Sequence, residues 1–107
     1  MASQRQIQVS QEMAHMAADF FARESNGQSL VTVTRADVSP DLKNVTIFFT
    51  TFPDKFQETV LHFARRNRTD FREYLKAHAK LKVLPHVEFE IDFGERNRQR
   101  IDDLTRS

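Results

Sequence analysis

The chain has 107 residues, of which 39% are hydrophobic and 29% charged, values that indicate a single ordered domain. It contains no cysteine and only two glycines, which excludes disulfides, thiolate metal sites and glycine-rich phosphate loops. No apolar run approaches the roughly 20 residues that span a bilayer, and the first residues resemble neither a secretory signal nor a transit peptide, so we expect a cytoplasmic protein without a membrane partner.

The N-terminal part of the chain predicts a helix over residues 8–25. Ser25-Asn26-Gly27 supplies its stop, because glycine readily takes the left-handed conformation that ends many helices. The apolar residues of this segment recur at intervals of three and four, which places them on one face of a helix. They are Val9, Met13, Met16, Ala17, Phe20 and Phe21.

Two β-strands joined by a turn are predicted next. Residues 30–38 are rich in β-branched side chains and alternate between apolar and polar. The alternation changes phase between Val33 and Ala36, which predicts a bulge or a bend. Residues 39–41, Ser-Pro-Asp, have the composition of a turn, so residues 45–50 are expected to form the return strand of a hairpin.

The helical period returns over residues 55–84 but is interrupted. The interruption is the polar run 65–70, which includes three residues that commonly cap helix N-termini, Asn67, Thr69 and Asp70. We therefore predict a helix–kink–helix element, in which oxygen atoms of these side chains cap the second helix.

The last strand, residues 86–93, has the clearest alternation of the chain. One side of a strand with this pattern faces the core and the other faces solvent. The residues expected in the core are Val87, Phe89, Ile91 and Phe93, and those expected in solvent are His86, Glu88, Glu90 and Asp92.

The predicted elements together form one α+β domain. Residues 1–93 have the order α-β-β-α-kink-α-β, which suits a two-layer arrangement with one small sheet covered by helices on its apolar side. Residues 94–107 form a polar C-terminal segment, in which Ile101 and Leu104 have the spacing of a short helix.

The sequence predicts no catalytic residue, metal site or cofactor. The histidines stand singly, without a second ligand at metal-binding spacing. They are His15, His62, His78 and His86. Carboxylates recur along the last strand, but such alternation is typical of a charged face in solvent. We therefore expect a protein that is not an enzyme.

The charge is distributed unevenly along the chain. Residues 65–82 carry seven basic and two acidic residues, a net charge of +5, whereas the other 89 residues have a net charge of −4. Within this basic segment, Arg68, Arg72, Lys76 and Lys80 recur every four residues, as one stripe of a helix does. A solvated helix face would show the same stripe.

The kink favours a binding function for the basic segment over a merely solvated face. Arg65, Arg66 and Arg68 lie where the second helix begins, at the positive end that attracts anions, and we expect them to stay clear of the core and free to meet phosphate. A row of cations also matches the row of phosphates in a nucleic acid, whereas the acidic side of the last strand disfavours RNA lying across the sheet. The predicted RNA-binding residues are Arg65, Arg66, Arg68, Arg72, Lys76, Lys80 and Lys82.

Several stretches of the sequence carry a resemblance to a known family. Residues 4–13 read QRQIQVSQEM, residues 38–48 contain a match to V-S-x-D-L-x-x-A-x-V, and residues 71–92 are similar to R-x-x-L…L-x-x-x-P-x-L-x-F-x-x-D. Arg100-Ile101 and Leu104 match a short C-terminal segment. In this order and spacing the stretches resemble bacterial ribosome-binding factor A over most of the chain.

This resemblance implies a type II KH-like fold and a non-enzymatic role. A protein of this kind is expected to bind the immature small ribosomal subunit and its rRNA and to assist late rRNA maturation, and we expect it to be a monomer when free. The family commonly kinks its helix at an Ala-x-Gly, where this chain has Asn67, Arg68 and Thr69. We therefore expect capping side chains to replace glycine at the kink.

Two other functions stay open on the residues alone. One is a general RNA-binding KH-like module, against which the absence of a G-x-x-G loop counts, because only glycine lets two backbones approach closely there. The other is a protein-interaction domain that uses the acidic strand face or the open edge of the hairpin.

Overall fold

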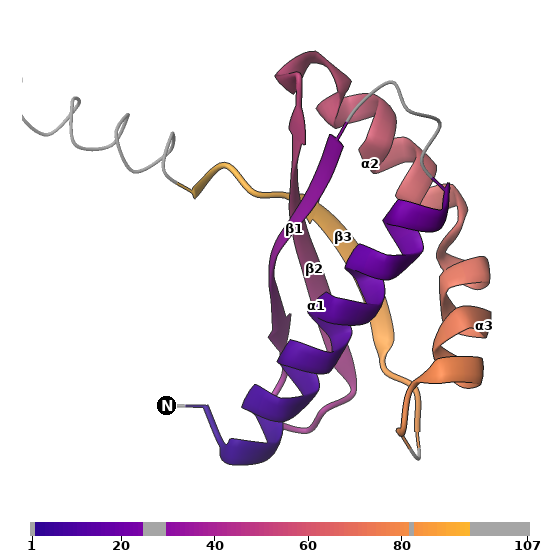
Figure 1. The fold of residues 1–107 in the computed structure, drawn as a ribbon. Helices are drawn as coiled ribbons and strands as arrows, with labels where there is room; N and C mark the ends of the chain where they lie inside the picture. The colour runs from indigo at the N-terminus through magenta and orange to yellow at the C-terminus, as the bar shows by residue number, and fades with distance from the viewer. Residues whose placement is uncertain (1, 25–29, 82, 95–107) are drawn as a thin grey trace, which may run out of the picture.

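The structure is a computed structural model that describes residues 2–24, 30–81 and 83–94. Three helices, one short 3-10 helix and three strands follow one another in the described part of the chain (Figure 1). They are α1 (Gln4–Glu24), β1 (Leu30–Val38), β2 (Asn44–Phe52), η1 (Asp54–Phe56), α2 (Gln57–Arg66), α3 (Arg68–His78) and β3 (His86–Ile91). This order confirms the predicted α+β arrangement with a broken second helix.

Two of the predicted segments lie outside the residues that the structure describes. These are the stop signal at Ser25-Asn26-Gly27 and the C-terminal segment beyond Gly94, with its Ile101 and Leu104.

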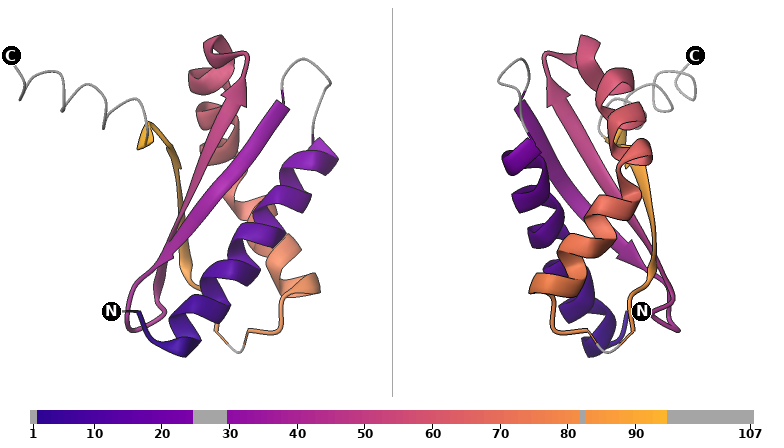
Figure 2. Two further views of the ribbon diagram at one scale, coloured as in Figure 1. Left: turned by 60° about the vertical axis from the view of Figure 1, so that its left-hand side comes forward. Right: turned by 90° about the vertical axis from the view of Figure 1, so that its right-hand side faces the viewer.

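The sheet has the order β1-β2-β3, with β1 and β3 at its edges. β1 and β2 form the predicted antiparallel hairpin, whereas β3 runs parallel to β2 and pairs Phe89 with Ile47. Parallel neighbours need a long crossover connection, which η1, α2 and α3 provide. All three helices cover one face of the sheet, α1 against β1 and α2 and α3 against β3 (Figure 2).

The core lies between the helices and the covered face of the sheet. Phe71 of α3 is fully buried, with its ring centroid 5.2 Å from that of Phe20 and 5.6 Å from that of Phe89. Apolar residues of every helix and strand complete this cluster, apart from η1. They are Val9, Met13, Ala17, Phe20, Phe21, Ala36, Val45, Ile47, Phe49, Leu61, Ala64, Phe71, Leu75, Val87, Phe89 and Ile91.

The prediction for Phe93 is wrong. β3 ends at Ile91, the Asp92 N–H still donates to the Phe49 carbonyl oxygen of β2 (2.7 Å), and Phe93, the next residue, is 45% exposed. Alternation along a strand keeps a side chain in the core only while the backbone stays in the sheet.

The first helix begins four residues earlier than predicted. Ser3 and Gln6 form a capping box, because the Gln6 N–H donates to Ser3 Oγ (3.1 Å) and the Ser3 N–H donates to Gln6 Oε1 (2.9 Å). The bulge in the hairpin is confirmed, since the pairing of β1 with β2 shifts register between Val33 and Arg35.

Candidate nucleic-acid interface

The predicted interface lies around the break between α2 and α3, and the break falls at Asn67. The backbone of this residue leaves helical geometry, with φ −106° and ψ 21°. Its N–H donates to the carbonyl oxygens of Phe63 (3.1 Å) and Ala64 (3.2 Å), and its side-chain Nδ2 also donates to the Phe63 carbonyl (2.8 Å). Asn67 therefore completes the hydrogen bonding of the end of α2.

The predicted capping mechanism is wrong. Asn67 makes no side-chain hydrogen bond to the start of α3, and Thr69 and Asp70 lie inside the first turn of that helix. An asparagine side chain has both a donor and an acceptor, and here the donor is used on the preceding helix. The break thus follows the predicted position but not the predicted chemistry.

The arginines near the break belong to two different helix ends. Arg65 and Arg66 lie in the last turn of α2, and Arg68 is the first residue of α3. The last turn of a helix carries the negative end of its dipole, which favours basic side chains. The expectation that all three lie at the positive end of the second helix therefore holds only for Arg68.

Two of these arginines form ion pairs with the edge strand β3. Arg65 Nη2 lies 3.4 Å from Glu90 Oε1, and Arg68 Nη1 is paired with Glu88 Oε1. The same Glu88 oxygen lies 3.1 Å from His86 Nε2. Both arginines stay clear of the core as expected, but neither is free to meet phosphate without releasing a glutamate.

Alternation along the last strand places Glu88 and Glu90 on a solvent face, and it does not indicate their role as partners of these arginines. The two glutamates are two residues apart on a strand, and the arginines are three residues apart at a helix break. These spacings match, but they become informative only when β3 is known to be an edge strand beside α2.

The remaining predicted cations differ in their surroundings. Arg66 and Arg72 are exposed, and neither forms an ion pair with another described residue. Lys76 Nζ lies 3.3 Å from Glu73 Oε1, with both side chains well exposed. Arg72 and Lys76 thus continue from Arg68 along α3, as the four-residue spacing predicts.

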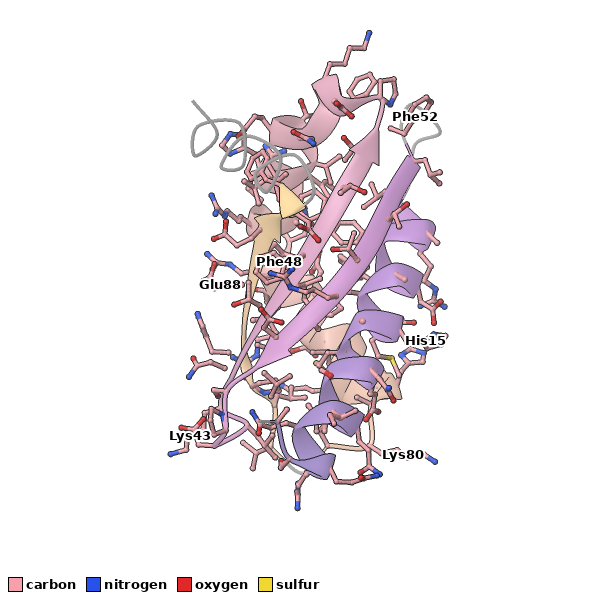
Figure 3. The ribbon with its side chains drawn as sticks, turned by 90° about the vertical axis from the view of Figure 1, so that its left-hand side faces the viewer. His15, Lys43, Phe48, Phe52, Lys80 and Glu88 are labelled. Carbon is pink, nitrogen blue, oxygen red and sulfur yellow. The ribbon has the colours of Figure 1, made fainter. Side chains whose placement is uncertain are left out.

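The predicted stripe does not extend to Lys80. The helix ends at His78, Ala79 is extended, and the Lys80 backbone N–H donates to Glu12 Oε1 of α1 (3.1 Å). Figure 3 shows Lys80 at the opposite end of the molecule from Phe52 and well away from Glu88. Lys82 lies outside the described residues.

A hollow of about 640 Å³ adjoins the last turns of α2. The described residues that line it are Thr59, His62, Arg65 and Arg66. Each of these side chains can donate a hydrogen bond, and two of them are arginines, which suit the oxygens of a phosphate group.

The face of the sheet without helices, on which Phe48 lies (Figure 3), carries charged side chains that pair with one another. The guanidinium carbon of Arg35 lies 4.0 Å from the centroid of the Phe48 ring. Arg35 Nε also lies 3.4 Å from Asp37 Oδ1, and Asp92 accepts a hydrogen bond from Thr34. The acidic side chains on this face disfavour a phosphate backbone.

Two further properties of the described residues bear on function. No group of three or more histidines or carboxylates among them is arranged to hold a metal ion. None of the described helices has both the length and the apolar character needed to cross a membrane.

Comparison with known proteins relates both the sequence and the fold to one family. Residues 5–105 match the family model described as Ribosome-binding factor A. The chain is 33% identical over 110 residues to Ribosome-binding factor A of Ruegeria sp. (strain TM1040), covering 97% of this chain and 81% of the relative. It is 29% identical to the protein of the same name from Bradyrhizobium sp. (strain ORS 278), covering 98% and 80%.

The fold is similar to that of solved structures. The crystal structure of ribosome-binding factor A from Thermus thermophilus gives a TM-score of 0.70 at 17% identity, covering 80% of this chain and 94% of the other. A Thermotoga maritima protein solved by NMR gives a TM-score of 0.69 at 16% identity, covering 89% and 94%. These likenesses confirm the expected KH-like fold.

Proposed function

Since the chain belongs to the ribosome-binding factor A family, we propose that it is a ribosome-assembly factor that binds the immature small ribosomal subunit. In this role it contacts the rRNA of that subunit and assists its late maturation, without catalysing a reaction itself. The single observation that carries the proposal is the family match over residues 5–105. The protein works in the cytoplasm and is a monomer when free.

The RNA contacts come from the helical side of the molecule. Arg66 and Arg72 are the first candidates, because they are exposed and have no ion-pair partner among the described residues. Lys76 is the next candidate, because its ion pair with Glu73 is exposed, and exposed ion pairs contribute little to stability. The other predicted cations add to the same electrostatic field, which attracts a phosphate backbone regardless of sequence.

Sedimentation with ribosomal subunits tests the proposed partner. The protein should sediment with immature small subunits more than with mature ones, and it should not sediment with an unrelated structured RNA of similar length. Equal binding to all three would instead support a general RNA-binding module. No binding to any of them would contradict an RNA role.

The salt dependence of binding tests the proposed contacts. If about five cations neutralise phosphates, the logarithm of affinity for small-subunit rRNA should fall with log salt at a slope of about −3.5 to −4.5. The variant Arg66→Gln/Arg72→Gln should bind more weakly and with a shallower slope, while its stability changes by less than about 0.5 kcal/mol per substitution.

The matched control for this variant is Arg5→Gln/Lys43→Gln. It removes the same two charges from exposed residues at the N-terminus and the hairpin turn. Its affinity should stay closer to that of the unsubstituted protein. Equal losses in both variants would mean that overall charge, not the surface of α2 and α3, determines binding.

A further inference from the structure

We propose that Glu88 and Glu90 form an autoinhibitory contact, in which they occupy Arg68 and Arg65 and must release them before RNA phosphates can bind these arginines. The inference rests on the proposed function, because rRNA is the ligand that competes. The protein thus carries, on β3 beside α2 and α3, side chains that compete with rRNA for these two arginines.

The geometry supplies the contact. β3 is an edge strand, and its residues Glu88 and Glu90 point away from the core residues Val87 and Phe89. Arg65 reaches Glu90 at 3.4 Å from the last turn of α2, and Arg68 reaches Glu88 from the first residue of α3. The two pairs thus bridge the helix break to the edge of the sheet.

The two arginines are also coupled to each other. Arg68 Nε donates to the backbone carbonyl oxygen of Arg65 at 3.3 Å, so the Arg68 side chain folds back over the end of α2. This hydrogen bond satisfies a carbonyl at a helix terminus. A phosphate that displaces Glu88 from Arg68 therefore acts on a side chain that both Glu88 and the Arg65 carbonyl oxygen hold in place.

The pairs are weak enough to be reversible. The side chains of Arg68 and Glu88 are 39% and 37% exposed, and those of Arg65 and Glu90 are 39% and 49% exposed. Ion pairs in such water-accessible positions contribute little to stability, whereas phosphate oxygens are strong acceptors for arginine. Phosphates arranged in a row can therefore displace both glutamates, but they bind more weakly than they would to free arginines.

The variant Glu88→Gln/Glu90→Gln tests the competition. Glutamine keeps the shape and a hydrogen-bonding oxygen but removes the charge. Since exposed pairs each oppose release by a factor of about 1.4 to 5, the variant should bind purified small-subunit rRNA about 2-fold to 25-fold more tightly. Circular dichroism and thermal unfolding check that it stays folded.

The matched control is Asp19→Asn/Asp37→Asn, which raises the net charge by the same amount. These substitutions also break exposed charge contacts, of Asp19 with His15 and of Asp37 with Arg35, but they release neither Arg65 nor Arg68. An equal gain in this control would show a general charge effect and overturn the autoinhibitory contact.

A second background isolates the arginines. In Arg65→Gln/Arg68→Gln protein, the two glutamate substitutions should no longer raise affinity by more than the control substitutions do. An undiminished gain there would contradict the proposal, as would a loss of affinity in Glu88→Gln/Glu90→Gln, which would mean that the glutamates position the arginines for RNA.

The wild-type protein separates the two proposals. If it binds rRNA with the expected salt slope but the glutamate variant binds equally well, the proposed function stands and the autoinhibitory contact is wrong. If only the glutamate variant binds, the autoinhibitory contact prevents binding completely in the wild-type protein. If neither binds, the RNA function fails and the contact fails with it.

Discussion

Individual side chains, rather than glycine, make the turn between β1 and β2. The Ser39 hydroxyl donates to Asp41 Oδ1 (2.6 Å), and the Lys43 N–H donates to the same oxygen (3.0 Å). The Asn44 N–H in turn donates to Ser39 Oγ (3.1 Å). Such side-chain hydrogen bonds are the reason that serine and aspartate favour turns. One carboxylate thus organises the reversal of the hairpin.

The first prediction concerns the pH dependence of this turn. The hydrogen bond from Ser39, followed by that from the Lys43 N–H, lowers the pKa of Asp41 below 3.8. A depressed folded-state pKa contributes stability above the unfolded-state pKa, and this contribution is lost as pH falls through the folded-state pKa. Asp41→Ala should therefore lower the free energy of unfolding at pH 7, and by less at pH 3.

Urea unfolding of both proteins at these two pH values, and at about pH 5, measures the difference. The difference in unfolding free energy between the two proteins should be constant from about pH 5 to pH 7. It should shrink only below pH 3.8, the ordinary pKa of an aspartate. A gap of the same size at pH 3 would mean that the carboxylate charge has no part in holding the turn.

The second prediction concerns Leu42 in the same turn. It has a φ of 63°, where a side chain is strained, yet it packs against the core. Leu42→Ala loses packing and keeps the strain, whereas Leu42→Gly loses packing and removes it. The glycine variant should therefore be more stable than the alanine variant by about 1 kcal/mol.

The exposed helical residue Ala77 provides the control for Leu42. Ala77→Gly should lower the free energy of unfolding by about 1 kcal/mol, because glycine is less favourable than alanine inside a helix. Chemical denaturation of all three variants gives both comparisons. If the Leu42→Ala protein is as stable as the Leu42→Gly protein, or more stable, the backbone strain at this position is small.

For helices and strands, periodicity in the sequence predicts most of the fold. Interrupted helical spacing located the break near Asn67, and the phase change after Val33 located the bulge. Both signals are local, because they depend on which side chains must face the core. The chemistry of the break was not predictable in this way, because asparagine can cap either the end of one helix or the start of the next.

The candidate site was less predictable than the fold for a related reason. Which cations are free depends on contacts between segments far apart in the sequence, such as Arg65 with Glu90. Charge spacing predicted a continuous stripe to Lys80, but a helix terminates where tertiary packing no longer supports it, here at His78. The basic segment was visible in the sequence, and its pairing was not.

The third prediction tests the role of the Asn67 side chain. If its amide N–H groups stabilise the break, both Asn67→Ala and Asn67→Asp lose the hydrogen bond to Phe63, and each should cost about 0.5–1.5 kcal/mol. Thr69→Ala should cost less than about 0.5 kcal/mol, because that side chain makes no capping bond.

Asn67→Asp is the informative variant of this set. Aspartate caps the start of a helix at least as well as asparagine, so it would be tolerated if the side-chain oxygen capped α3. Its negative charge is unfavourable at the end of α2. Thermal or urea unfolding that shows an unchanged Asn67→Asp protein would contradict the donor role and restore the oxygen cap.

One core joins α1, α2 and α3 to the sheet. α2 contributes Leu61 and Ala64 to it, and α3 contributes Phe71 and Leu75. The two helices are separated by the single residue Asn67, and both pack on β3. Since neither helix has a core of its own, the break does not divide the molecule into parts that could unfold separately.

The last prediction is that substitutions in α2 and in α3 lower the stability of the same cooperative unit. Leu61→Ala and Leu75→Ala each leave a cavity at a buried position. Each should lower the free energy of unfolding by about 2–5 kcal/mol. That is a large share of the roughly 5–15 kcal/mol that stabilises most domains. The denaturation midpoint should fall in both variants, while the m-value should not change.

Tyr74 makes this test possible, because the chain has no tryptophan and no other tyrosine. Its ring lies on α3, stacked on that of His78 at 4.3 Å and tilted against that of Phe20 at 6.0 Å. Its fluorescence therefore reports on α3, whereas far-ultraviolet circular dichroism reports on all helices. In the Leu61→Ala protein the two signals should change at the same urea concentration. If circular dichroism changed first and Tyr74 fluorescence followed at higher urea, α2 would unfold before α3, and the helix break would mark a boundary between separately stable parts.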